Sequence, residues 1–154
     1  MIGTHLQIRP AELRDRQILS NLTFCQTHAH RHLDWRHPLD WLGSPYFWLI
    51  EEDGRALATL ACPPDPPGVA WLRLFAYGGA VSASEAWSAL WDLAREEIAR
   101  GGGAQVAVIA MQTWMRDLLE RTEFDWLQNL VMLEWQGRPA LPPSLHAGLH
   151  LRAM

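Results

Sequence analysis

The chain has 154 residues, a length that fits one domain with one hydrophobic core. Hydrophobic residues make up 49% of it and charged residues 19%, which is typical of a globular protein rather than a disordered one. A net charge of −4 without a basic cluster argues against nucleic-acid binding. No apolar run is long enough to span a membrane, and the two cysteines are too few for a disulfide framework, so we expect a reduced cytoplasmic protein.

The N-terminal part of the chain predicts a strand followed by helices. Leu6–Arg9 is expected to be a short strand that ends at Pro10, and apolar residues at helical spacing predict a helix over Ala11–Cys25. Gln26–Gly43 is rich in His and Trp and is expected to form a second, irregular helix.

The middle of the chain predicts a series of strands. Tyr46–Glu51 and Arg55–Cys62 are expected to be two strands of a hairpin, because Asp53-Gly54 between them is a type I′ turn signal. A Pro-rich loop follows at positions 63–68. Val69–Tyr77 is largely apolar and is therefore expected to be a central strand.

The C-terminal part alternates helices and strands. Ala83–Arg100 carries a wide apolar stripe and predicts a helix, with a strand at Gln105–Ala110 that must run parallel to the preceding one. A short helix is expected at Thr113–Arg121 and a final long strand at Phe124–Trp135. The Pro-containing tail, Gly137–Met154, is expected to be a linker plus a terminal strand.

This order of elements resembles that of the GNAT acyltransferases. Ile8-Arg9-Pro10-Ala11 resembles the opening of that family, and Arg121-Thr122-Glu123-Phe124 resembles the end of its penultimate helix. The resemblance implies an α/β (α+β) fold with a mixed, mostly antiparallel sheet, a central splayed parallel pair and several flanking helices. Residues 1–136 would form this GNAT-like domain, and residues 137–154 the linker and terminal strand.

The resemblance also implies an activity, N-acyl transfer from acetyl-CoA or another acyl-CoA to a small amine, with no metal required. In the family, acetyl-CoA lies where the parallel strands splay apart, its thioester and pantetheine on strand amides and its pyrophosphate on the next helix N-terminus. The cofactor-binding residues implied here are Phe75, Ala76, Tyr77, Ser82, Ala83 and Ser84.

Two positions depart from the family pattern. The helix start has no glycine, and its Ser82-x-x-Glu85 capping box would occupy an amide and place a carboxylate where a pyrophosphate should arrive. Leu119 stands where many members carry a catalytic tyrosine, which leaves Tyr77 as the candidate general acid. A second hypothesis therefore stays open: a catalytically inactive GNAT-like binding or assembly domain, such as the first half of a tandem GNAT protein, with a second such domain or a second copy as partner.

Histidines are concentrated in the predicted second helix, Gln26–Gly43. On a helix, His28 and His32 would be i, i+4 neighbours, a spacing that can chelate zinc, but a solvated polar face is the favoured interpretation. In GNAT enzymes this region lines the acceptor site. The resemblance therefore makes His28, His32 and Trp35 the candidate substrate-binding residues.

Overall fold

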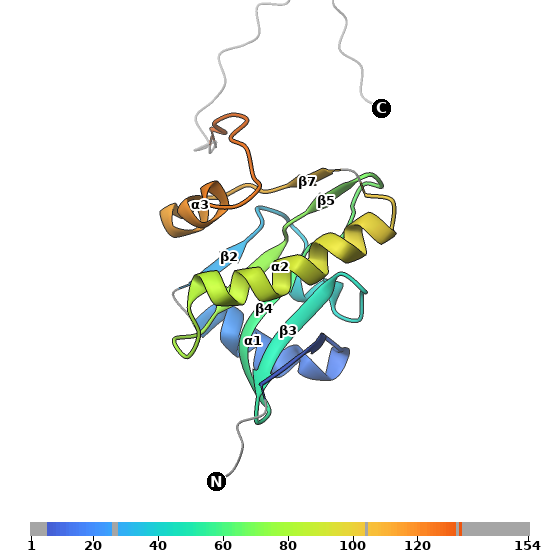
Figure 1. Ribbon diagram of the computed structural model, residues 1–154, viewed down its shortest axis with the longest axis vertical. Coiled ribbons are helices and arrows are strands. Elements are labelled where there is room, and N and C mark those ends of the chain that lie inside the picture. The colour runs from blue at the N-terminus through green and yellow to red at the C-terminus, as the bar shows by residue number, and fades with distance from the viewer. Residues whose placement is uncertain (1–5, 26–27, 104, 132, 134–154) are drawn as a thin grey trace, which may run out of the picture.

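A five-stranded antiparallel sheet forms the centre of the structure, a computed structural model that describes residues 6–25, 28–103, 105–131 and 133 (Figure 1). Its strand order is β1-β3-β4-β6-β2, and a separate pair, β5 and β7, runs parallel. The strands are β1 (Leu6–Pro10), β2 (Ala29–Arg31), β3 (Phe47–Glu52), β4 (Arg55–Ala61), β5 (Val69–Trp71), β6 (Leu74–Tyr77) and β7 (Gln105–Ala107). The strand pairing is therefore mostly antiparallel with one parallel pair, and together with the helices this confirms the expected fold class.

Helices cover both faces of this sheet. In Figure 1, α2 crosses the front of the sheet and α1 lies behind it. The helices are α1 (Arg16–Cys25), α2 (Ala83–Arg100) and α3 (Thr113–Glu120), with two 3-10 turns, η1 (Leu13–Asp15) and η2 (Pro38–Trp41). None of the helices in the described part of the chain is long and apolar enough to cross a bilayer.

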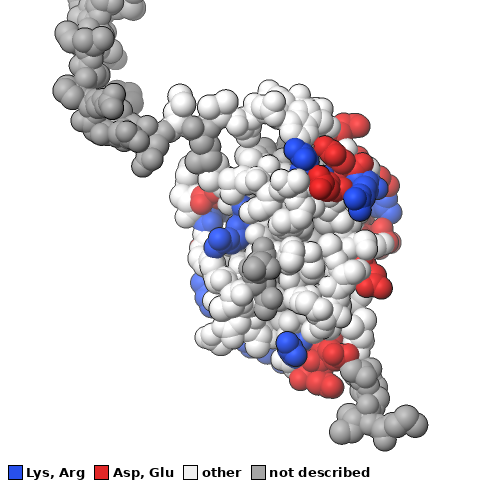
Figure 2. Space-filling model, turned by 90° about the vertical axis from the view of Figure 1, so that its left-hand side faces the viewer, with Lys and Arg blue, Asp and Glu red and all other residues white. Residues whose placement is uncertain are grey.

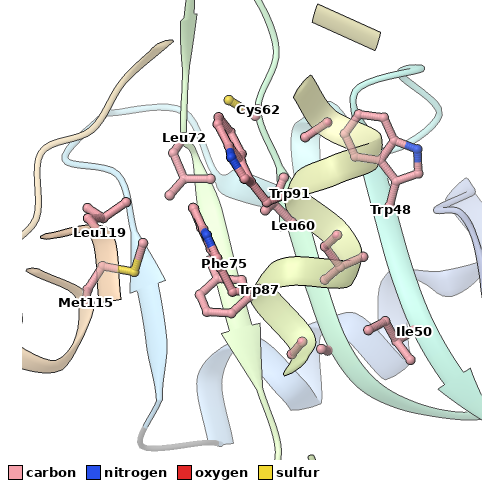
Figure 3. Close-up of a cluster of buried hydrophobic side chains, with 14 of the residues drawn as sticks. Trp48, Ile50, Leu60, Cys62, Leu72, Phe75, Trp87, Trp91, Met115 and Leu119 are labelled. Atoms are coloured by element: carbon pink, nitrogen blue, oxygen red, sulfur yellow. The ribbon is translucent and has the colours of Figure 1, made fainter. Parts of the chain in front are cut away.

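Alternating side chains of β3 build a core on each face. Phe47 and Leu49 pack with the apolar side chains of α1, whereas Trp48 and Ile50 belong to the cluster under α2. In this second cluster, drawn in Figure 3, the indoles of Trp87 and Trp91 stack on one another and reach Phe75 and Leu72 of the sheet. The tryptophans of α2 are therefore core residues and do not line a ligand cavity.

The turn between β3 and β4 confirms the hairpin prediction. Asp53 and Gly54 both have positive φ, 49° and 76°, as a type I′ turn requires. This turn pairs Glu52 with Arg55, and the register then shifts by one residue between Ile50 and Glu51, so that Phe47 lies opposite Ala61.

The predicted second helix over Gln26–Gly43 is wrong. Among its described residues the structure has the strand β2 and the 3-10 turn η2 instead. Pro38 disfavours a helical conformation at His37 and opens η2, and Gly43 adopts a φ of 83°, so no regular α-helix can run through this part.

The predicted single strand Val69–Tyr77 is two strands separated by a β-bulge. The N–H of Arg73 donates to the carbonyl of Ala61, although the register pairs Ala61 with Leu74. Two residues thus oppose one, which bends the strand between β5 and β6. The central place predicted for this strand is confirmed, since β6 lies between β4 and β2.

The predicted helix at Ala83–Arg100 and the parallel arrangement of β7 with β5 are confirmed. The predicted strand Phe124–Trp135 is wrong in its described residues, which form no strand. Strand propensity alone does not make a strand, because a strand needs a hydrogen-bonding partner. The predicted linker and terminal strand at Gly137–Met154 lie outside the described residues.

The packing of α2 on the sheet gives a direct stability test. Leu90 is fully buried, so Leu90→Ala should lower the free energy of unfolding by about 2–5 kcal/mol through lost burial and the cavity it leaves. Leu93→Ala on the same helix, where the side chain is 36% exposed, is the matched control and should cost much less. Denaturant unfolding of both variants measures this, and equal losses would contradict the assigned face of α2.

Candidate functional site

Strand β2 lies along the edge of β6 where the parallel strands were predicted to splay apart. On this edge, the N–H of Leu72 donates to Ala107 of β7, the last residue of that strand. From Leu74 onward the same edge pairs with β2, with Ala29 opposite Ala76 and Arg31 opposite Leu74. The opening expected beside β6 is therefore filled by the chain itself.

The backbone amides predicted to hold an acyl-CoA are already bonded. The N–H of Tyr77 donates to the carbonyl of His28 over 3.1 Å. Since N–H groups two residues apart point the same way in a strand, Phe75 also faces β2, where the register places it opposite His30. Ala76 faces β4, opposite Thr59. β2 and β4 thus occupy the amides of all three residues.

Aromatic rings hold the first end of β2. The ring of His28 stacks on Tyr77 at a centroid distance of 4.9 Å and meets the edge of Trp114 at 5.7 Å. Burial raises the pKa of Tyr77 above its ordinary value, so the phenol stays protonated at neutral pH. A protonated phenol suits a general acid, but its ring is packed against the strand that fills the cleft.

The middle of β2 is held by a buried histidine. His30 is fully buried, and its Nε2 lies 3.3 Å from the carbonyl oxygen of Leu72. Burial lowers the pKa of His30 to about 4, so its ring is neutral at physiological pH. A neutral imidazole facing a carbonyl is a donor, which fixes the tautomer with the proton on Nε2.

A buried arginine holds the far end of β2. Arg73, only 7% exposed, forms an ion pair with Asp34 and a longer one of 3.5 Å with Asp65. Its guanidinium also lies 5.6 Å from the centre of the Trp41 ring. Asp34 lies shortly after β2, beyond His32 and Leu33, and the N–H of His32 donates to the carbonyl of Arg73 over 2.9 Å. These contacts fasten the chain after β2 to the bulge.

The N-terminus of α2 is closed by its own side chains. Ser82 Oγ accepts from the N–H of Glu85, and Glu85 Oε2 accepts from both the N–H and the hydroxyl of Ser82, the latter over 2.6 Å. These hydrogen bonds lower the pKa of Glu85, which therefore stays ionised. The predicted capping box is confirmed, and it places a negative charge at the helix end that favours anions.

The structure separates the predicted substrate-binding residues. His28 and His32 lie at opposite ends of the β2 pairing, roughly 13 Å apart for four residues of extended chain. The helical zinc pair is therefore wrong. Trp35 is 97% exposed and lines, with Arg36 and Asp65, a cavity of about 450 Å³ at the Arg73 end of the sheet, away from Tyr77. No three metal-ligating side chains gather within the ranges that the structure describes.

Several solved structures with a similar fold are acetyltransferases. An aminoglycoside N-acetyltransferase in complex with CoA is 16% identical, with a TM-score of 0.61 over 87% of this chain and 97% of that one. An acetyltransferase from Trypanosoma brucei is 15% identical, with a TM-score of 0.61 over 85% and 100%. A predicted acetyltransferase from Clostridium acetobutylicum with acetyl-CoA is 12% identical, with a TM-score of 0.57 over 84% and 96%. No family model and no curated protein sequence matches.

The chain has the GNAT acetyltransferase fold. Two features that the resemblance implied are present: the parallel pair β5 and β7, and the helix α2 between them. The segment between α1 and β3 supplies β2, which pairs with the edge of β6 where an opening was expected.

An acyl-CoA does not fit the GNAT cleft of this chain as it stands. Its pantetheine would need the edge of β6 that β2 occupies, and its pyrophosphate would meet the ionised Glu85 at α2. Figure 2 looks onto the side of the molecule that carries α3 and β2, and there acidic side chains lie beside most basic ones, with no broad basic surface for phosphates.

Sequence reasoning missed the pairing of Arg73 with Asp34. A signal was present, since Arg73 interrupts an otherwise apolar run from Leu72 to Tyr77, and a charge at such a place needs a buried partner. The identity of that partner could not be derived, because Asp34 is distant in sequence and was assigned to a helix.

The buried His30 predicts a pH dependence of stability. Its pKa is about 4 in the folded protein and 6.5 when exposed, so the unfolded chain binds more protons between these values. Its stabilising effect is complete above pH 6.5 and falls by about 3 kcal/mol as the pH drops to 4. Burial and the nearby Arg73 lower the pKa of His32 as well, so His32 contributes to the same pH dependence. A variant that lacks His30 is therefore needed to separate the two contributions.

The measurement is urea unfolding between pH 4 and pH 7 for the wild-type chain and His30→Met. The variant should lose most of the decline in unfolding free energy over this range. His37→Gln, the change of an exposed histidine, is the control and should keep the decline. An unaltered profile in His30→Met would contradict the buried neutral imidazole.

Proposed function

We propose that this chain is a GNAT-fold binding or assembly domain that does not transfer acyl groups in the conformation described. The observation that carries the proposal is the pairing of β2 with β6, in which the N–H of Tyr77 donates to His28. The backbone donors of this cleft already form hydrogen bonds within the chain. An acyl-CoA could bond to them only after those hydrogen bonds had broken.

The α2 N-terminus supports the same proposal independently. The CoA pyrophosphate needs free amides and a positive helix end, and here Glu85 supplies a carboxylate that is held in place by Ser82. The chain's own residues therefore bond to the amides of β6 and cap the N-terminus of α2, the two places where an acyl-CoA was expected to bind.

The proposal predicts that the full chain does not bind acetyl-CoA. Calorimetric titration with acetyl-CoA and with CoA, both to millimolar concentration at neutral pH, should give only heats of dilution. A GNAT enzyme of known affinity, titrated in the same buffer, is the control for ligand quality. Saturable binding at micromolar concentration would overturn the proposal.

The second candidate is the N-acyltransferase of a small amine, acting after β2 has left β6. Its support is the likeness to acetyltransferases solved with CoA or acetyl-CoA, together with the shortness of β2, which is only three residues long. In this case closure lowers the apparent affinity for acyl-CoA by the fraction of molecules that are open.

Weakening β2 separates the two candidates. His30→Gly removes the ring buried in the middle of β2, whereas Arg31→Gly removes an exposed side chain from the same strand at the same backbone cost. If the site is latent, His30→Gly should bind acetyl-CoA at least tenfold more tightly than Arg31→Gly in the same titration. If the domain is non-catalytic, neither variant binds.

If His30→Gly binds acetyl-CoA, the next experiment is a screen of small amines as acyl acceptors. Acetylation of small amines by His30→Gly and not by Arg31→Gly would support the acyltransferase, with Tyr77 as its candidate acid. Thermal unfolding of both variants checks that each is folded at the assay temperature.

A further inference from the structure

The cavity at the Arg73 end of the sheet lies outside the cleft that β2 fills. Its volume of about 450 Å³ is within the range of small-ligand sites. Its described walls are residues 32–36, which follow β2, together with Asp65 and Arg73, and none of them belongs to β6. The cavity is therefore present in the same conformation in which the acyl-CoA site is closed.

Arg73 brings to this cavity a buried guanidinium whose hydrogen bonding is incomplete. Its Nη1 pairs with Asp34, but Nη2 has only long contacts to Asp65, 3.4 Å to the carbonyl oxygen and 3.5 Å to the carboxylate. Among the described residues, Nε of Arg73 has no hydrogen-bond partner, and neither has the buried Nδ1 of His32. Because a buried polar atom without a partner costs free energy, this wall favours a ligand that brings oxygen atoms to it.

Two carboxylates supply acceptors on the same wall. Asp34 accepts from Arg73 and from the backbone N–H of Arg36, and Asp65 accepts from the Arg36 guanidinium over 3.3 Å. A carboxylate has about four lone-pair positions, so each can take a further donor. His32 adds no charge at neutral pH, because burial and Arg73 lower its pKa. The wall thus carries donors and acceptors in balance, with no net charge.

Trp35 supplies an apolar surface beside these polar groups. Its side chain is 97% exposed although it lines the cavity, and the neighbouring Leu33 is 44% exposed. A large aromatic ring left in water gains free energy when a ligand covers it. The cavity therefore combines an open aromatic face with a polar wall.

The balance of charge selects the kind of ligand. An ammonium group would meet two guanidinium groups whose carboxylate partners are already engaged, and an anion would meet the two carboxylates. A hydroxyl group suits this wall better, because it donates one hydrogen bond and accepts two. A sugar ring carries several hydroxyl groups at its edge and presents C–H groups on its face, which match the polar wall and the indole.

We propose that this cavity binds a neutral polyhydroxylated ligand, a mono- or disaccharide, with its hydroxyl groups on Arg73, Asp34 and Asp65 and one ring face on Trp35. The inference rests on the proposed function in one respect, since it names the ligand class of a binding domain. It differs from the small amine of the second candidate, because the cavity disfavours a cation.

Saturation-transfer NMR with the full 154-residue chain tests this against glucose, galactose, mannose, maltose, cellobiose and lactose at millimolar concentration. At least one of these sugars should receive saturation from the protein. Its affinity is then measured by titration, following the indole N–H signal that is lost in Trp35→Ala. The corresponding amino sugar at pH 6, where its amine is charged, and the corresponding uronic acid should each bind at least tenfold more weakly than the neutral sugar.

Trp35→Ala should lower the affinity for the neutral sugar at least tenfold in the saturation-transfer assay. Trp126→Ala is the matched control, because Trp126 is an exposed indole, at 59%, that does not line the cavity. It should bind as the wild type does, and thermal unfolding should show that both variants are folded. Three results would each overturn the proposal: no saturation of any neutral sugar, which would leave the cavity to solvent, equal binding by Trp35→Ala and the wild type, or tighter binding of a charged analogue.

These outcomes are independent of the acetyl-CoA titration. A chain that binds both a neutral sugar and acetyl-CoA would overturn the non-catalytic function and leave the saccharide site standing. A chain that binds neither would overturn the saccharide site and leave the non-catalytic function standing.

Discussion

The edge of β6 can hold one occupant, and in this protein the occupant is β2. The bulge at Arg73 bends the central strand, so that β7 pairs before it and β2 pairs after it on one continuous edge. A small ligand that needed the same amides would have to displace a strand that is also held by packed rings at Tyr77 and by the ion pair with Asp34. The chemistry open to the domain depends on this competition.

The position of the ion pair explains why β2 stays in place. Arg73 is nearly buried, and removing one partner of a buried pair leaves the other charge without compensation, which costs several kcal/mol. Asp34 is therefore bound firmly to the bulge, and the backbone N–H of Arg36 also donates to it and, ahead of Arg73, lowers its pKa. The chain on the C-terminal side of β2 is fixed at the bulge, and His28 fixes its other side. A three-residue strand between two such anchors loses little further entropy when it pairs.

Much of the fold could be predicted from the sequence, because its signals are local. The Asp53-Gly54 turn, the capping box at Ser82 and the apolar stripe of α2 each act within a few residues. The residues that fill the site could not be predicted, because their positions depend on contacts between residues far apart in the sequence. A segment such as Ala29-His30-Arg31 carries no alternating pattern and becomes a strand only because β6 offers it an edge. Its histidines suggested a helical face, and Pro38 was the one local signal against it.

A general physical rule explains why the edge of β6 is covered. A strand edge with exposed N–H and C=O groups attracts any extended backbone, and a fold must either cover it or pair it. The chain covers the β6 edge with β2, which closes the route that a GNAT enzyme gives to its acyl donor. Within the described residues β7 pairs only with β5. A cleft that is filled by a strand of its own chain must open before any ligand can use the backbone amides of β6.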